Sequence, residues 1–278
     1  MSNNQSSQPI GIFDSGVGGL TVFKEVRNTF PSENLIYFGD TARVPYGPKS
    51  NNTVIDYSVQ NARFLLQQGV KIIVVACNTS SAVALDYLKK ILNIPVIGVI
   101  EPGAETAVEA TSNRKIGVIG TEATIRSKAY TNAIRSLDKR IEVYEQACPL
   151  FVSLAEEGWH KSEISRDVAK IYLGNLISKG IDTLVLGCTH YPILKDIIQD
   201  VCGEKIRLVD SAVAIQSHLK QYINNEHNNI LGKNYFYVSD NEDKFLKIAK
   251  MILDIKSFNL EKVRLGESWY IQYDQIGF

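Results

Sequence analysis

The chain has 278 residues, of which 45% are hydrophobic and 22% are charged, and its 30 basic residues balance 30 acidic ones. This composition excludes a collagen-like or intrinsically disordered chain, and the length suits two domains or one large α/β domain. A formal net charge of zero provides no overall basic field, so we expect neither nucleic acid nor a membrane as a partner.

The lack of a recognisable targeting signal and the spacing of the cysteines both indicate a reducing compartment. No stretch approaches the ~20 consecutive apolar residues of a membrane span, and the first residues, MSNNQSSQP, do not resemble a signal peptide. The cysteines show no C-x-x-C spacing and the histidines no metal-like spacing, so we expect no disulfide framework and no metal site. The sequence therefore predicts a cytoplasmic protein with free thiols at Cys77, Cys148, Cys188 and Cys202.

Short β-branched runs alternate along the chain with longer segments of helical spacing. The predicted strands are Ile10 to Asp14, Leu35 to Gly39, Ile72 to Cys77, Val96 to Ile100, Ile116 to Thr121, Ile141 to Ala147, Leu184 to Cys188, Arg207 to Val209 and Tyr235 to Val238. The predicted helices are Leu20 to Phe30, Val54 to Gln68, Ala82 to Leu92, Ile125 to Leu137, Ile164 to Ser178 and Ile193 to Val201. This alternation predicts an α/β fold with parallel sheets built from βαβ units.

Two motifs recur in the same order at nearly the same spacing. The run IGIFDS at residues 10–15 resembles IGVIGT at 116–121, and VVACNT at 74–79 resembles VLGCTH at 185–190 with the cysteines aligned. Buried parallel strands can look alike because Val, Ile and Gly dominate them, which is the alternative explanation. We expect a duplication: two similar α/β domains related by a pseudo-twofold axis, with the active site in the cleft between them.

The chain is expected to cross between these domains twice, near Pro102-Gly103 and again near Asp210. The first domain would then be discontinuous. Its predicted extent is residues 1–99 together with 211–278, and the second domain is predicted to comprise residues 100–210.

Cys77 and Cys188 each end an apolar run and precede polar residues at the start of a helix. A helix N-terminus lowers the pKa of a thiol and makes it a usable base or nucleophile. Two thiols on opposite sides of one cleft suit the inversion of a carbon centre, because one removes a proton and the other delivers a proton to the opposite face. The alternatives are covalent catalysis by one cysteine with His190, and two small buried apolar side chains.

Polar residues follow several of the predicted strands, where α/β sheets bind ligands. Asp14 precedes a glycine-rich turn that lacks the G-x-G-x-x-G spacing of a dinucleotide loop, and Asp40 is only a loose candidate for a ribose contact. We favour a turn whose N–H groups hold a carboxylate, while Asp14 meets an ammonium group, assists a thiol or caps a helix. Further residues can line a site for a small zwitterion or cap helices, and the Pro- and Gly-rich Val44–Lys49 segment lies beside it or forms a surface turn. These lining residues are Asn78, Thr79, Ser80, Ser81, Thr189 and His190.

Six motifs between about residue 10 and residue 212 are together highly specific: GIFDSGVGGLTV, YFGDTARVPYGPKS, VVACNTSSA, VIGVIEPG, IGVIGTEATI and LVLGCTHYPIL. By these motifs the chain resembles the bacterial glutamate racemases of the cofactor-independent aspartate/glutamate racemase superfamily. The resemblance implies two-base racemisation of glutamate without a cofactor, supply of D-glutamate for peptidoglycan, and a homodimer.

The resemblance also implies residue roles. Cys77 would act on the α-proton of D-glutamate and Cys188 on that of L-glutamate, each assisted on its own side by Asp14 or His190. A glutamate just before Gly158 is implicated as well, for which Glu156 is our choice and Glu157 the alternative. The implied substrate contacts are Asp14, Ser15, Tyr46, Gly47, Asn78, Thr79, Thr121, Thr189 and His190.

Two other classes of protein remain open. A racemase or isomerase for aspartate or another amino acid would keep both cysteines and differ in its side-chain pocket. A thiol hydrolase or a small-ligand binding module could use the same two-domain scaffold. The hydrolase would survive the loss of one cysteine, and the binding module would survive the loss of both.

Overall fold

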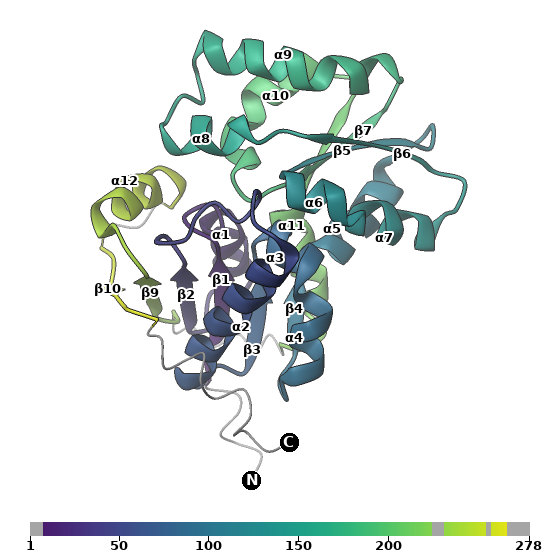
Figure 1. Cartoon of the computed structure of the whole chain (residues 1–278). Coiled ribbons are helices and arrows are strands. Elements are labelled where there is room, and N and C mark those ends of the chain that lie inside the picture. Colours follow the sequence, from purple (N-terminus) through teal and green to yellow (C-terminus); the bar gives the residue numbers. More distant parts are fainter. Residues whose placement is uncertain (1–7, 224–230, 254–256, 266–278) are drawn as a thin grey trace.

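The described parts of a computed structural model, residues 8–223, 231–253 and 257–265, contain two parallel sheets, one above the other in Figure 1. The lower sheet has the strand order β10-β9-β2-β1-β3-β4, with β1 (Ile10–Asp14), β2 (Leu35–Gly39), β3 (Ile72–Val75), β4 (Val96–Gly98), β9 (Asn234–Val238) and β10 (Leu260–Lys262). The upper sheet has the order β6-β5-β7-β8, with β5 (Lys115–Gly120), β6 (Glu142–Ala147), β7 (Thr183–Gly187) and β8 (Arg207–Asp210). The predicted α/β class with parallel sheets is confirmed.

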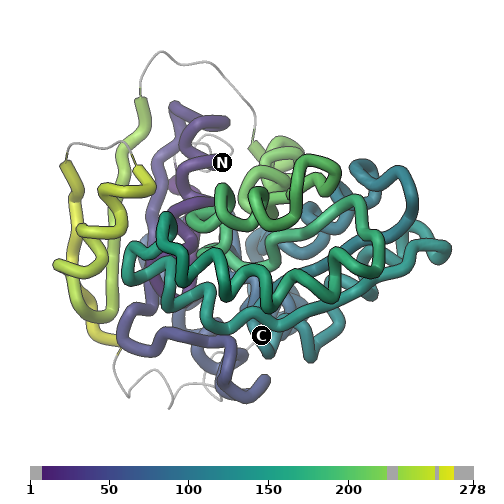
Figure 2. The backbone as a smooth tube through the Cα atoms, turned by 90° about the horizontal axis from the view of Figure 1, so that it is seen from above, coloured from purple at the N-terminus to yellow at the C-terminus, as the bar shows by residue number. Residues whose placement is uncertain are grey.

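Helices cover both faces of each sheet (Figures 1 and 2). On the lower sheet, one face packs against α1 (Leu20–Thr29), α11 (Ser211–Leu219) and α12 (Glu242–Ile252), and the other against α2 (Asn51–Gln67) and α4 (Leu85–Ile91). On the upper sheet, one face packs against α8 (Leu150–Glu156), α9 (Glu163–Ser178) and α10 (Lys195–Cys202), and the other against α5 (Ile100–Ala110) and α7 (Ala129–Leu137). The short elements α3 (Asn78–Val83), α6 (Glu122–Ser127) and η1 (Tyr191–Leu194) begin close to strand ends.

The central strands are buried on both faces, which is why they read as continuous apolar runs. In β1, Ile10 and Ile12 enter one hydrophobic cluster, whereas Phe13 enters the cluster on the opposite face. Burial of each such side chain contributes roughly 1.5–3 kcal/mol, so these strands hold the strand ends that follow them in fixed positions.

The two sheets share one local strand order. In β2-β1-β3-β4 and in β6-β5-β7-β8, the strand that comes first in the chain lies between the second and the third. The helices that follow the first and third strands lie on opposite faces, and this divergence opens a crevice at the carboxyl ends. The recurring motifs fall on the paired positions β1 and β5, and β3 and β7. The pseudo-twofold axis itself stays a prediction.

The predicted crossover near Pro102-Gly103 falls in the first turns of α5, where a proline is tolerated because the first N–H groups of a helix have no partner within it. One predicted helix is wrong in detail. The predicted helix from Ile125 to Leu137 is interrupted at Lys128, which has a left-handed backbone with φ 58°. Between β4 and β5 the chain passes through α5, and after β8 it returns through α11.

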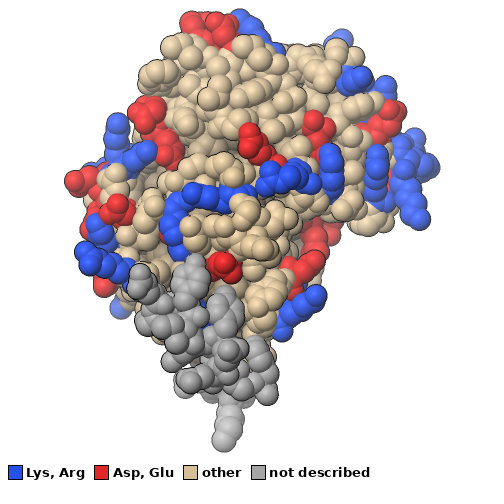
Figure 3. All heavy atoms as spheres, viewed as in Figure 1, with Lys and Arg blue, Asp and Glu red and all other residues tan. Residues whose placement is uncertain are grey.

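The charged surface carries no dominant sign on the face in Figure 3, where acidic and basic side chains are interspersed. Among the described helices, none is long and apolar enough to cross a membrane.

Candidate active site

The two cysteines singled out by sequence occupy equivalent places in the two sheets. Cys77 follows β3 and immediately precedes α3, and Cys188 directly follows β7. Both line one small cavity of about 20 Å³, which has room for little more than one water molecule. Most of the predicted substrate residues line it as well: Ser15, Tyr46, Gly47, Asn78, Thr79, Thr121, Thr189 and His190.

Cys77 is buried, with 5% of its surface exposed. Burial and, to a smaller extent, the charge of Asp14 raise the pKa of this thiol to about 12, because the hydrogen bonds from Ser80 and Ser15 offset only part of these effects. The expectation that a helix N-terminus lowers the pKa is therefore wrong for Cys77: its helix has only six residues, and desolvation outweighs the donors there.

Asp14 lies behind the cavity and not in its wall. Its Oδ2 accepts a hydrogen bond from the Gly16 N–H at 3.0 Å, and its Oδ1 accepts one from the Thr189 hydroxyl at 3.2 Å. Complete burial raises the pKa of this carboxyl, although the charge of His190 and these hydrogen bonds oppose the rise. Asp14 thus joins the glycine-rich turn of the lower sheet to the segment after β7.

His190 connects the second cysteine to a carboxylate. Its Nδ1 lies 3.9 Å from Sγ of Cys188, and its Nε2 lies 3.1 Å from Oε1 of Glu156. Burial lowers the pKa of the imidazole, but the contacts with Cys188 and Glu156 more than offset this effect and raise it to about 10. Glu156, at the end of α8, occupies the position beside His190, whereas Glu157 is exposed.

Glu156 is held on both of its oxygens. Lys244 of α12 places Nζ 2.8 Å from Oε2, opposite the contact to His190. Burial raises the pKa of Glu156, but hydrogen bonds and charges from His190 and Lys244 prevail and lower it to about 2. The carboxylate therefore remains ionised beside the imidazole.

Hydroxyl and amide groups connect the two sheets across the cleft. The Thr79 hydroxyl lies 2.8 Å from that of Thr121, which also accepts a hydrogen bond from the Thr124 N–H and so caps α6. Asn78 donates through Nδ2 to the hydroxyl of Tyr130 at 2.8 Å, while its buried Oδ1 has no partner within the described residues. An unpaired acceptor in a cavity wall suits a ligand that brings a donor, such as an ammonium group.

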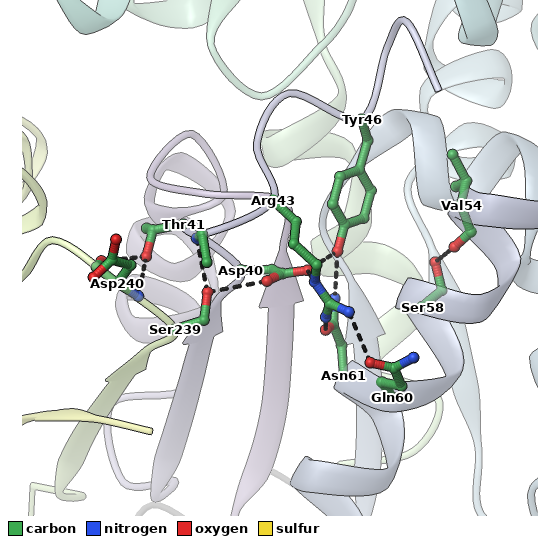
Figure 4. A network of polar contacts seen from close by, with 11 residues as sticks. Asp40, Thr41, Arg43, Tyr46, Val54, Ser58, Gln60, Asn61, Ser239 and Asp240 are labelled. Atoms are coloured by element: carbon green, nitrogen blue, oxygen red, sulfur yellow. Dashed lines mark hydrogen bonds and ion pairs between the residues drawn. The ribbon is translucent and has the colours of Figure 1, made fainter. Parts of the chain in front are cut away.

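The loop between β2 and α2 is fixed by a buried polar network (Figure 4). Arg43 donates to Asp40 at 2.6 Å, to Gln60 at 2.7 Å and to Asn61 at 3.1 Å. The Tyr46 hydroxyl donates to the same Asp40 carboxylate, and its ring lines the cavity. Asp40 is thus paired by Arg43 and Tyr46 of this loop and by the Ser239 hydroxyl, which leaves no support for a ribose contact.

Other lining residues gave weaker sequence signals. Val44 and Pro45 lie in the segment expected near the cleft, but Val152 of α8 is an ordinary apolar residue that no motif marks. Tyr130 does not line the cavity but holds Asn78, and it was not predicted because only the fold brings α7 against α3. Cys148 and Cys202 are buried in the hydrophobic cluster of the upper sheet, as expected of structural cysteines.

A larger cavity of about 300 Å³ lies beside α1, α10 and α12 and contains neither Cys77 nor Cys188. Among the described residues, no group of three or more His, Cys, Asp and Glu side chains is arranged to hold a metal ion. The chemistry that the motifs indicate is therefore concentrated in the small cavity between the sheets, with two thiols, a carboxylate and an imidazole in or directly behind its wall.

Two parallel sheets with a cysteine at each switch point define a class of protein, and the family comparison agrees with it. The model of the Asp/Glu/hydantoin racemase family matches residues 20–219, and the chain belongs to this family. The chain is 52% identical over 262 residues to a glutamate racemase of Sulfurihydrogenibium sp. (strain YO3AOP1), covering 93% of this chain and 98% of the relative. It is 49% identical to a glutamate racemase of Geobacter metallireducens, covering 92% and 96%.

Solved structures agree. A glutamate racemase isoform from Bacillus anthracis superimposes with a TM-score of 0.89 at 38% identity, covering 94% of this chain and 98% of that one. A glutamate racemase from Francisella tularensis in complex with D-glutamate has a TM-score of 0.85 at 41% identity, with the same coverage. An aspartate racemase from Picrophilus torridus, at 18% identity and a TM-score of 0.53, shares the fold alone. The predicted resemblance and the predicted racemase class are confirmed.

Proposed function

We propose that this chain interconverts L-glutamate and D-glutamate by proton transfer between two opposed thiols. The observation that carries the proposal is that Cys77 and Cys188, at matching strand ends of two sheets, line the same cavity. The substrate is taken from the names of the curated relatives, which are glutamate racemases. The chemistry is taken from the two thiols in the cavity.

In the direction from L- to D-glutamate, the Cys188 thiolate removes the α-proton, so that an S–H bond forms as the C–H bond breaks. The Cys77 thiol then delivers its proton to the opposite face of the carbanion, and the reverse direction exchanges the two roles. His190 holds positive charge beside Cys188, whereas Asp14 raises the pKa of Cys77 and so favours the protonated thiol that donates its proton there. Glu156 orients His190 through its hydrogen bond. No cofactor takes part in this scheme.

The remaining residues of the cavity hold the substrate. The hydroxyls of Thr79 and Thr121 and the N–H groups of the glycine-rich turn after Asp14 act as donors to carboxylate groups. The Thr189 hydroxyl donates to Asp14 and can accept from the ammonium group of the substrate. The unpaired Oδ1 of Asn78 accepts from the ammonium group. Ser15, Tyr46 and Gly47 complete the wall and exclude water.

The same proposal includes the pathway, the cellular location and the assembly of the enzyme. Its product would enter peptidoglycan synthesis, its location would be cytoplasmic, and its assembly would be a homodimer. We also propose that residues 1–99 and 211–278 form one domain and residues 100–210 the other. The strands of the two sheets fall on either side of these boundaries, which supports this division.

The substrate assignment is tested by steady-state racemisation of L-glutamate and L-aspartate by the purified, reduced enzyme. We expect a higher kcat/KM for glutamate. A higher kcat/KM for aspartate would favour the related racemase class. An enzyme that racemises neither amino acid but retains ligand binding would favour the binding module.

A further inference from the structure

Lys244 joins helix α12 to the upper sheet beside the active site. Helix α12 belongs to the lower sheet, where Phe245, Ile248 and Ala249 pack into its hydrophobic cluster, and Asn241 caps its start through the Lys244 N–H. From this anchored turn, the Lys244 ammonium reaches Glu156 of α8 at 2.8 Å. In Figure 1, α12 lies below and to the left of α8.

The contact continues inward to a cysteine. The second oxygen of Glu156 lies 3.1 Å from Nε2 of His190, and Nδ1 of the same ring lies 3.9 Å from Sγ of Cys188. Four side chains therefore form one line from the surface to the thiol. Exposure falls along the line: the side chain of Lys244 is 42% exposed, that of Glu156 is 12% and that of His190 is 3%.

A carboxylate held on both oxygens has one orientation, whereas a carboxylate held on one can rotate. The Glu156 side chain hydrogen-bonds an imidazole whose ring plane must keep Nδ1 directed at Cys188. Removing Lys244 leaves Glu156 ionised but free to turn about its remaining contact, and His190 loses part of its support. Lys244 lies on α12, which packs on the lower sheet, and Glu156 lies on α8, which packs on the upper sheet. This support therefore exists only while the two sheets are close together.

Cys77 has a different environment. Its neighbours are Asp14, Ser15 and Ser80, which come from the lower sheet itself. Asp14 is itself contacted by Thr189 of the upper sheet. The line of contacts from Cys188 differs because it continues outward through His190 and Glu156 to Lys244, on a helix of the opposite sheet.

We propose that Lys244 is a positioning residue for proton transfer at Cys188. Through Glu156 it holds His190 against that thiol when the sheets approach each other, and it has no such role in proton transfer at Cys77. This inference rests on the proposed racemisation.

Primary kinetic isotope effects on kcat/KM separate the two half-reactions. With α-deuterated L-glutamate the effect reports on removal of deuterium by Cys188, and with α-deuterated D-glutamate it reports on removal by Cys77. In Lys244→Met, we expect kcat/KM to fall by roughly two- to fivefold, as for loss of a partly exposed ion pair. Slower transfer at Cys188 raises the isotope effect with L-glutamate, and it lowers the effect with D-glutamate because the carbanion returns to Cys77 more often.

Three further variants complete the test. His190→Asn alters the contact of Cys188 directly, so it shows in which direction each of the two isotope effects changes when proton transfer at Cys188 is impaired. Lys244→Arg keeps the charge and should restore both isotope effects. Lys247→Met removes an exposed lysine from the same helix and should leave both unchanged.

Opposite changes in Lys244→Met, in the same sense as in His190→Asn, support the proposal. Equal changes of the isotope effect with both substrates would overturn it, and so would the same opposite changes in Lys247→Met. Either result would leave the racemisation itself intact. A wild-type protein that exchanges no α-proton would instead overturn the proposed function, and this proposal with it. Thermal unfolding of the two Met variants verifies that both are folded.

Discussion

Gly18 lies so close to His190 that a side chain on it would overlap the imidazole: a Cβ atom built there would be 2.6 Å from Nδ1 of His190. The same atom would be 2.5 Å from the Thr189 hydroxyl. The glycine-rich turn of the lower sheet therefore approaches the segment after β7 with backbone alone. A glycine is required here for close contact, and its φ angle imposes no such requirement.

Gly18→Ala should lower kcat/KM by roughly 10²-fold, because the added methyl group displaces His190 and Thr189 by a large part of an ångström. Gly174→Ala is the matched control, since a Cβ at this position in α9 meets no atom within 4 Å. We expect it to retain activity and to gain roughly 0.5–1 kcal/mol of stability. Racemisation assays and urea unfolding measure both, and a fully active Gly18→Ala enzyme would contradict the close contact.

Cys77→Ser and Cys188→Ser, each alone, should reduce kcat/KM by roughly 10² or more in both directions, because each direction uses one thiol as base and the other as acid. Cys202→Ser, in the hydrophobic cluster at the end of α10, is the control and should remain an active racemase. The measurement is the rate of racemisation from each enantiomer. Survival of the activity after loss of either thiol would argue for single-cysteine chemistry.

Arg43→Lys should destabilise the loop that carries Tyr46. A guanidinium reaches Asp40, Gln60 and Asn61 together, but a lysine ammonium cannot reproduce this planar fork. We expect a loss of roughly 1–3 kcal/mol in the free energy of unfolding, and a raised KM because the cavity wall shifts. The exposed Arg135→Lys on α7 should change stability by less than about 0.5 kcal/mol. Equal effects of the two substitutions would refute the role of the network.

The stabilising contribution of His190 should depend on pH in a defined direction. Its pKa rises from 6.5 to about 10 in the folded protein, so the protonated form favours folding. The stability of the wild type relative to His190→Asn should thus be greatest below pH 6.5 and decrease as pH rises toward 10, by on the order of a few kcal/mol. Unfolding curves of both proteins across this range measure the difference. A constant or growing difference would contradict the assignment of a protonated imidazole.

Admission of glutamate requires the two sheets to separate, because the cavity has room for little more than one water molecule. The Ala123 N–H donates to the Gly47 carbonyl at 3.1 Å, across the cleft. We expect this amide to exchange about tenfold more slowly with glutamate at about ten times its Kd, because bound substrate favours the closed form. Hydrogen exchange with mass spectrometry measures this. Equal protection with and without glutamate would contradict closure of the two sheets on the substrate.

The strands and the site were predictable because both depend on local patterns. β1 and β2 match their predicted bounds, since continuous apolar runs between polar turns mark buried parallel strands. Apart from Val152, the residues that line the cavity fall in motifs that follow strands, where the α/β fold concentrates ligand contacts. The same local reasoning misjudged Cys77, whose pKa is set by burial that no spacing reveals.

What the sequence did not reveal depends on contacts between distant segments. Lys244 is one lysine among several on its helix, and only the packing of α12 brings it to Glu156. The three-residue edge strand β10 has no apolar alternation to mark it. The break at Lys128 also has no local signal, because a lysine rarely adopts a left-handed backbone.

The central claim is proton transfer at the α-carbon of glutamate between Cys77 and Cys188. The most direct test incubates the purified, reduced, cofactor-free enzyme with L-glutamate in deuterated water, and follows optical activity and α-deuterium together. Loss of optical activity, with deuterium entering the D-glutamate formed, is the predicted result. Unchanged optical activity in folded protein with reduced thiols would contradict the assignment.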